Sequence, residues 1–192
     1  MNELNRRDVL QRLAILLGGT ISAPALAGIR GEKTYHGISV EATTKQINII
    51  REVADLIIPS TGTPGAKAAK VEEFIVRVVK DCYTQEDQNH FYAGLDHLNA
   101  DCKSVHGKEF LEANATQQKE ALTKCMLEAD QERKANRGKK APTPFFFMIK
   151  ELSTTGYFTS KIGASEALEY LPIPGKFDGC MPLSPSQKTW AI

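Results

Sequence analysis

The sequence of 192 residues lacks an excess of charge of either sign. Its 24 lysines and arginines balance 23 aspartates and glutamates, so the net charge is +1. A dedicated nucleic-acid binder normally carries a basic excess, which is missing here. The hydrophobic fraction of 42% and the charged fraction of 24% are ordinary for a globular protein. They exclude a collagen-like or wholly disordered chain, and the length favours one domain, or one domain with a tail.

The motifs that mark common catalytic and cofactor sites are also missing. The chain has no GxSxG nucleophile elbow, no Walker loop and no GxGxxG element. Nothing therefore supports a hydrolase, an NTPase or a nucleotide-binding fold. It has no CxxC pair and no CxxCH. These absences disfavour a structural zinc site, a thioredoxin-like redox site and a covalently attached c-type haem.

A long hydrophobic run is absent from the N-terminal region. Residues 13–29 are uncharged, but a membrane-spanning helix needs about 20 mostly apolar residues, and this stretch is shorter and contains several polar residues and glycines. A charged head, a modest apolar middle and a small-residue end are typical of a removable export signal. The adjacent arginines indicate its twin-arginine version. A general secretory signal with incidental arginines and a retained anchor are the alternatives.

We therefore predict a twin-arginine export signal over residues 1–27, defined by Arg6, Arg7, Ala25 and Ala27. The mature protein is then expected in the periplasm, alone or associated with a membrane through a complex. In that oxidising compartment the four cysteines, Cys82, Cys102, Cys125 and Cys180, can form no, one or two disulfides. The alternative is that the first three are small apolar core residues.

The hydrophobic pattern predicts an all-α fold, with one orthogonal or bundle-like domain over residues 28–171. Apolar residues recur at helical spacing over about 44–58, 85–105 and 116–135, along a stripe from Val71 to Cys82, and after Pro144. The β-branched alternation of a sheet is largely missing. The side chains expected inside are Phe74, Val78, Phe91, Leu95, Leu98, Val105, Leu122, Met126, Met148 and Leu152.

Polar residues and glycines at the segment ends predict where these helices begin and end. Thr43 or Thr44 is expected to cap the first helix, and Thr116 the fourth. Gly107 is expected to end the third helix. Pro144 suits the first turn of the fifth helix, and Gly156 suits its C-terminal cap.

Residues 172–192 form a different kind of segment. Four prolines and two glycines prevent a continuous helix, so an extended tail is predicted. The segment also holds large apolar side chains. It can lie as a strap across its own domain or dock on another protein. We predict that Phe177, Cys180 and Trp190 contact a partner, because large aromatics dominate interface energy when they fill pockets. Cys180 could bridge to the partner; an internal disulfide is the alternative.

Two clusters of polar residues allow both a structural and a functional interpretation. His90 and His97 share a helical face, with His106, Asp87 and Asp96 nearby. Helical metal pairs more often use a spacing of three or four, so exposed or capping histidines are the simpler interpretation. A basic stretch after the fourth helix complements the helix dipole, or steers docking to an acidic surface. Its members are Arg133, Lys134, Arg137, Lys139 and Lys140.

Six short blocks along the chain carry a family resemblance. They are ADLIIP (54–59), TGTPGA (61–66), Val71 with Phe74-Ile75, PFF (144–146), LSTTGYF (152–158) and YLPIPGKFDGC (170–180). With the twin-arginine start, they resemble the gluconate 2-dehydrogenase subunit 3 family. The resemblance implies a small subunit with no catalytic residue and no cofactor of its own.

In that family the small subunit supports export and maturation of a large FAD-containing subunit of the glucose-methanol-choline oxidoreductase type. A c-type cytochrome commonly accepts the electrons. The resemblance therefore implies an accessory subunit of a periplasmic sugar dehydrogenase, without a transmembrane span or a nucleic-acid partner. The alternative is a stand-alone periplasmic helical enzyme or metal-binding protein that uses His90 and His97.

Overall fold

The computed structural model describes residues 41–139 and 141–171, and positions 173, 175, 179, 180, 182, 185 and 187–191 of the C-terminal segment. The predicted export signal, with Arg6, Arg7, Ala25 and Ala27, lies outside the described residues. So do Lys140 and Phe177.

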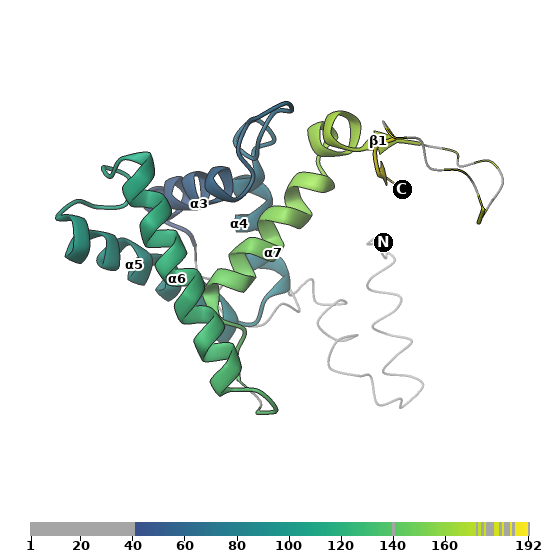
Figure 1. Cartoon of the computed structure of the whole chain (residues 1–192). Coiled ribbons are helices and arrows are strands. Elements are labelled where there is room, and N and C mark those ends of the chain that lie inside the picture. The colour runs from purple at the N-terminus through teal and green to yellow at the C-terminus, as the bar shows by residue number, and fades with distance from the viewer. Residues whose placement is uncertain are drawn as a thin grey trace, which may run out of the picture. The chain divides into compact units, whose positions relative to one another are not determined.

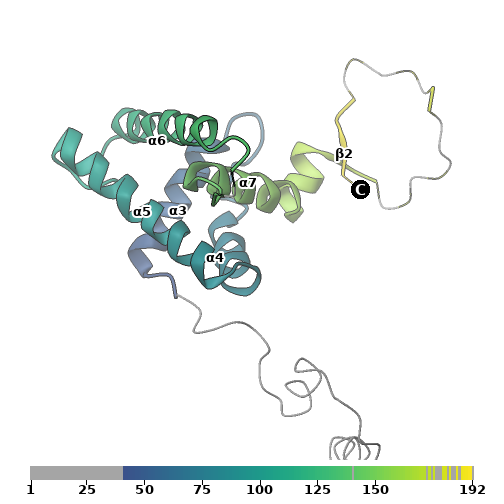
Figure 2. The ribbon, with the colours of Figure 1, turned by 90° about the horizontal axis from the view of Figure 1, so that it is seen from below.

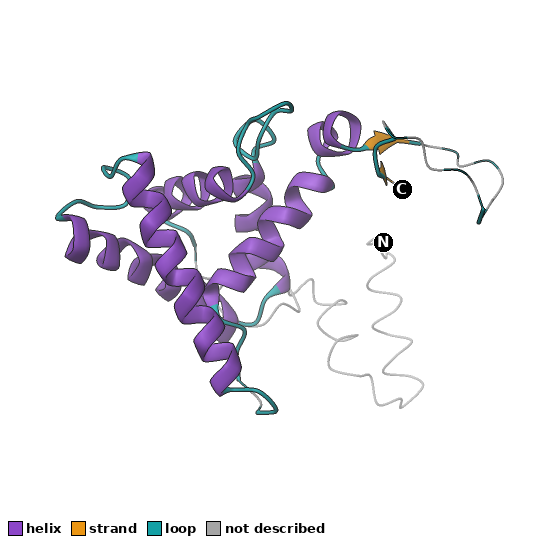
Figure 3. Cartoon of the chain, in the orientation of Figure 1, coloured by secondary structure: helices purple, strands orange, loops and turns teal. Residues whose placement is uncertain are grey.

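The described part of the chain is mostly helical and contains almost no strand, which confirms the all-α prediction (Figure 1). Figure 3 colours the same view by secondary structure. The elements are α3 (Thr44–Ile57), α4 (Val71–Cys82), α5 (Gln85–His106), α6 (Ala115–Ala135), α7 (Phe145–Phe158), a π-helical turn η1 (Gly163–Ala167), β1 (Glu169–Tyr170) and β2 (Trp190–Ala191). None of the described helices is both long and apolar enough to cross a lipid bilayer.

Side-chain caps determine where several helices begin. Thr43 caps α3 as predicted, in a capping box with Gln46. The prediction that Thr116 caps α6 is wrong, because the cap is Asn114. Asn114 has Gln117 three residues later, and the Gln117 side chain accepts from the Asn114 amide at 3.1 Å. The residue at the same offset from Thr116 is Lys119, which has no acceptor, so only Asn114 can form a capping box.

Helix α7 is the central helix of the domain. It packs against α3, α4, α5 and α6 (Figure 2). A helix that is apolar on nearly all sides is stable only where neighbours cover it on several sides. The buried residues of α7 are Phe145, Phe146, Met148, Ile149, Leu152, Ser153, Gly156 and Tyr157.

Gly156 does not have its predicted role as the C-terminal cap of this helix. It is a buried interior residue of α7, which continues to Phe158. A Cβ at Gly156 would lie 2.6 Å from Phe74 Cδ1 of α4. The glycine therefore permits close packing of two helices rather than a left-handed turn. Gly107 does end α5 in a left-handed conformation, with φ of 68°, as predicted.

The predicted core is correct for the middle of α5 and α6 but not for every position. Leu95, Leu98 and Leu122 are buried, whereas Phe74 and Val78 are partly buried and pack against the core. Val105 is 62% exposed and Met126 is 38% exposed, so both were wrongly placed inside.

The buried faces of α5 and α6 account for both errors. The buried stripe of α5 runs through Phe91, Leu95, Leu98 and Cys102. At 3.6 residues per turn this stripe continues between positions 105 and 106, and the structure turns His106 rather than Val105 toward the interior. The His106 side chain is accordingly only 13% exposed. In α6 the buried face runs through Gln118, Leu122 and Ala129, and Met126 lies outside it.

The loop between α3 and α4, at the top of Figure 1, is held to α7. The Tyr157 hydroxyl donates to the Pro64 carbonyl oxygen at 2.6 Å. The Ser60 hydroxyl oxygen accepts from the Gly65 amide at 2.9 Å. A Cβ at Gly65 would lie 2.6 Å from the Ser60 nitrogen, so the tight loop requires glycine there. The TGTPGA block thus forms a compact loop anchored by the LSTTGYF block.

The end of the C-terminal segment pairs with the residues just before that segment. Strand β2 pairs in parallel with β1, in the register Glu169 with Trp190 and Tyr170 with Ala191. Trp190 is 39% exposed and Tyr170 is 61% exposed. Pairing through two residues per strand leaves these aromatic rings accessible.

Candidate functional site

A groove of about 320 Å³ lies where α5, α6 and the beginning of α7 meet. Its polar wall contains His90 and His97 from α5 and Glu128 and Glu132 from α6. Its apolar lining is Ala93, Gly94, Cys125, Ala129, Pro144, Phe145 and Phe146. The groove therefore contains both histidines of the predicted candidate pair.

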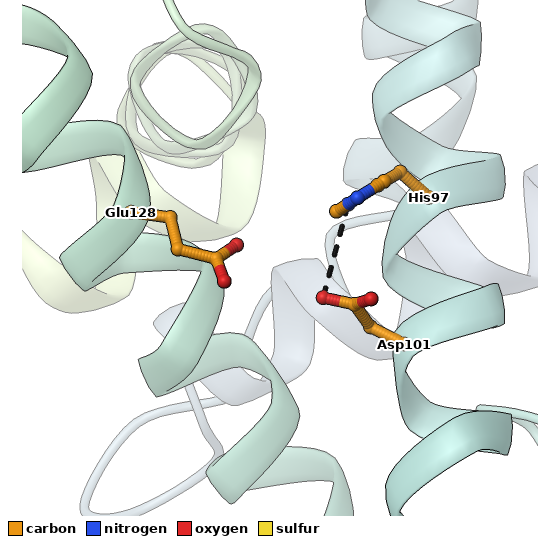
Figure 4. A group of neighbouring side chains, drawn as sticks. All are labelled: His97, Asp101 and Glu128. Carbon is orange, nitrogen blue, oxygen red and sulfur yellow. Dashed lines mark ion pairs between the residues drawn. The ribbon is translucent and has the colours of Figure 1, made fainter.

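His97 and Glu128 of this groove form a potential metal-ligand cluster with Asp101, which lies outside the groove lining. One ligand atom each from His97, Asp101 and Glu128 lies within 4.8 Å of the others (Figure 4). His97 Nδ1 lies 3.8 Å from Asp101 Oδ2, one helical turn away. Imidazole and carboxylate are ligand types that zinc accepts. His90 is not part of the cluster, so the predicted pair of His90 and His97 is replaced by a different set.

A lysine already supplies a cation to this cluster. Lys124 Nζ lies 3.0 Å from Asp101 Oδ2 and 3.6 Å from Glu128 Oε1. The hydrogen bond to Asp101 is the main reason that the pKa of Lys124 is raised. A metal ion would have to displace this ammonium group, so the arrangement is an exposed ion-pair network in which Lys124 takes the place of a metal.

Cys125, in the lining of the groove, is held in its thiol form. Burial raises its pKa to about 11, with smaller contributions from the negative charges of Glu128 and Asp101. The thiolate is the nucleophilic and metal-binding form of cysteine. At neutral pH this side chain is therefore suited to packing rather than to catalysis.

The other cysteines occupy different environments. Cys102 is fully buried in the core, as the packing alternative expected, whereas Cys82 is exposed. Cys82, Cys102 and Cys125 all carry free thiols. Cys180 is exposed in the C-terminal segment.

Most of the remaining polar residues near the predicted histidine cluster pair with neighbouring side chains. Asp87 accepts from the Thr84 hydroxyl at the beginning of α5, and Asp96 accepts from Gln46 of α3 at 3.3 Å. His106 Nε2 lies 3.8 Å from Glu120 Oε2. His90 Nε2 is buried without a hydrogen-bond partner among the described residues.

Two members of the cluster were missed at the sequence level. Asp101 follows His97 by four residues, a spacing that places both on one helical face and could have drawn attention to it. Glu128 lies on another helix, and its proximity to His97 has no sequence signal because it arises from the packing of α5 against α6.

The comparison with family models agrees with the resemblance found in the sequence. The model described as Gluconate 2-dehydrogenase subunit 3 matches residues 44–175, from the first residue of α3 to beyond β1. No curated protein and no solved structure matches the chain. Because the match covers the five α-helices of the described residues and more than half of the chain, this protein belongs to the gluconate 2-dehydrogenase subunit 3 family and is thereby a subunit of a dehydrogenase complex.

Proposed function

We propose that this chain is the non-catalytic small subunit of a periplasmic FAD-dependent sugar dehydrogenase. It is exported by the twin-arginine route and supports export, maturation and stability of the flavoprotein subunit. The observation that carries the proposal is the family match over residues 44–175, which include the five α-helices of the described residues. The Arg6-Arg7 pair in the N-terminal region adds independent support for the export route.

The chemistry of the groove favours an accessory role over catalysis. The carboxylates of Asp101 and Glu128 share the ammonium group of Lys124, and the Cys125 thiol remains protonated. The groove therefore offers no activated nucleophile among these groups. In the complex, the FAD and the sugar site belong to the partner, and a c-type cytochrome accepts the electrons.

The proposed export mechanism explains why such a subunit is useful. The twin-arginine system carries proteins that are already folded, so a flavoprotein can receive its cofactor inside the cell. A helical subunit that binds the folded flavoprotein can then provide the export signal for both chains. The extended C-terminal segment supplies exposed aromatic surface for this association, with Trp190 as one anchor.

Purification of the tagged full chain from the periplasm tests the proposal. We expect a flavin-containing dehydrogenase subunit to co-purify with it. Removal of residues 176–192 should reduce this recovery while the helical core stays folded, and Trp190→Ala should weaken binding. Large interface aromatics often contribute 2 kcal/mol or more, so a loss of affinity of about 30-fold is expected.

Thr189→Ala, next to Trp190, serves as the control because Thr189 has a small polar side chain. Circular dichroism of each variant checks that the helices are retained. If the truncated chain binds the dehydrogenase subunit with unchanged affinity, the C-terminal segment is not part of the interface and only lies across its own domain. Absence of any dehydrogenase subunit from the wild-type preparation would overturn the proposed function itself.

The His97, Asp101 and Glu128 cluster favours one second candidate, a metal-binding protein. We expect the purified mature chain to hold far less than one zinc or iron per molecule, because Lys124 competes for the same oxygens. Elemental analysis after dialysis measures this directly. Stoichiometric metal that is lost in His97→Ala would favour the second candidate instead.

A further inference from the structure

A second hollow, of about 380 Å³, lies beside the C-terminal end of α6. Arg133, Arg137 and Lys139 contribute its charged groups, and Pro142, Pro144 and Phe147 contribute apolar surface. We name it the basic hollow. It combines positive charge with an apolar floor, and the proposed function has not assigned it a role.

Two of its cations are not compensated. Arg133 Nη2 and Lys134 Nζ both pair with Asp130, at 2.9 Å and 2.7 Å. Arg137 and Lys139 form no ion pair with any described carboxylate and are exposed. Asp130 therefore pairs with both Arg133 and Lys134, whereas Arg137 and Lys139 remain available for a ligand.

The helix dipole accounts for only part of this charge. Arg133 and Lys134 lie in the last turn of α6, where cations complement the partial negative charge of the helix end. Arg137 and Lys139 lie beyond the helix, which ends at Ala135, and Gly138 between them turns the chain with φ of 81°. Their placement around the hollow has no such structural explanation.

The floor of the basic hollow indicates an apolar component in the ligand. The Arg133 guanidinium lies 4.3 Å from the centroid of the Phe147 ring, which fixes both groups by a cation–π contact. Pro142 and Pro144 add rigid apolar surface. A simple inorganic anion would leave this surface uncovered, whereas a peptide segment can place an apolar side chain on it between carboxylates.

The neighbouring groove argues against a flat anionic surface as the occupant. Pro144 lines both the basic hollow and the groove that contains Glu128 and Glu132. The negative charges of Glu128 and Glu132 near this shared residue disfavour close approach of an anionic lipid surface. A protein segment avoids the conflict, because it can present acidic residues to the hollow alone.

We propose that the basic hollow binds an acidic segment of the large dehydrogenase subunit, with carboxylates against Arg137 and Lys139 and an apolar side chain against Phe147. This inference rests on the proposed function, because it requires that the chain has such a partner. Charge complementarity of this kind accelerates association and determines orientation.

The test measures binding of the full chain to the flavin-containing subunit that co-purifies with it, at about 50 mM and 300 mM salt. Arg137→Glu combined with Lys139→Glu should weaken binding at low salt by about tenfold or more, mainly through slower association. The salt dependence of the remaining affinity should also be smaller.

Lys108→Glu combined with Lys119→Glu is the matched control, since it makes the same change in charge at two exposed residues. Within α6, Lys119 precedes Ala135 by 16 positions, so it lies about 24 Å from the helix end that borders the hollow. The control should bind like the wild type. Thermal unfolding of all variants checks that their stability is preserved.

Three results would overturn the inference. If the Arg137 and Lys139 double variant binds like the wild type, the hollow is not a docking site, although the proposed function stands. If that variant loses binding to anionic phospholipid vesicles but not to the dehydrogenase subunit, the occupant is a membrane. If the wild-type chain binds no dehydrogenase subunit, the proposed function fails together with this inference.

Discussion

Replacement of both Arg6 and Arg7 by lysine should block export of this chain and leave the proposed flavoprotein partner inside the cell. The twin-arginine system recognises the arginine pair, whereas a general secretory signal requires only positive charge near its apolar segment. Lysine preserves that charge, so the double substitution separates the two routes. We expect nearly complete loss of both proteins from the periplasmic fraction, measured by immunoblotting and by dehydrogenase activity.

Arg12→Lys is the matched control, because it makes the same chemical change in the N-terminal region but leaves Arg6 and Arg7 intact. Each outcome has a distinct meaning. Continued export of the small subunit after the double substitution would identify a general secretory signal. Retention of the small subunit with a normal periplasmic level of the flavoprotein would show that the partner has its own route.

Leu95→Ala should destabilise the helical domain by about 2–5 kcal/mol, the usual cost of removing a buried leucine side chain. Leu95 is 0% exposed and belongs to the central stripe of α5, which packs against α3, α6 and α7. The substitution removes buried apolar contacts and leaves a cavity that the surrounding helices can only partly close. Urea unfolding monitored by circular dichroism measures the loss.

Val105→Ala on the same helix is the control for this measurement. Val105 is 62% exposed, although simple spacing predicted it to lie inside. Its truncation should change the free energy of unfolding by no more than about 0.5 kcal/mol. A large effect at Val105, or a small one at Leu95, would show that the buried face of α5 is assigned incorrectly.

Local chemistry was sufficient to predict the helices. The capping box of Thr43 and Gln46, the left-handed Gly107 and the apolar stripes of α5 and α6 are short-range features, and the structure contains all of them. Errors arose where two local signals competed. Asn114 and Thr116 are both good capping residues, and only the position of Gln117 decides between them.

The role of Gly156 required knowledge of tertiary packing. A glycine near the end of an apolar segment commonly marks a helix C-terminus. In this domain Phe74 of α4 lies against Gly156, so the same residue serves close packing inside α7. Nothing within a few residues of Gly156 reports the approach of a side chain that is 82 positions away in the sequence.

By itself the sequence determined the all-α class, the approximate helix positions and the family, because these depend on periodicity, capping residues and contiguous blocks. Only the tertiary structure decided which polar groups meet. The packing of α5 against α6 brings Glu128 beside His97 and Asp101, and Lys124 beside Asp101. The chain direction after α6 likewise places Arg137 and Lys139 around Phe147. These contacts join separate elements of the chain, and helical periodicity specifies which face of a helix is buried but not which neighbour covers it.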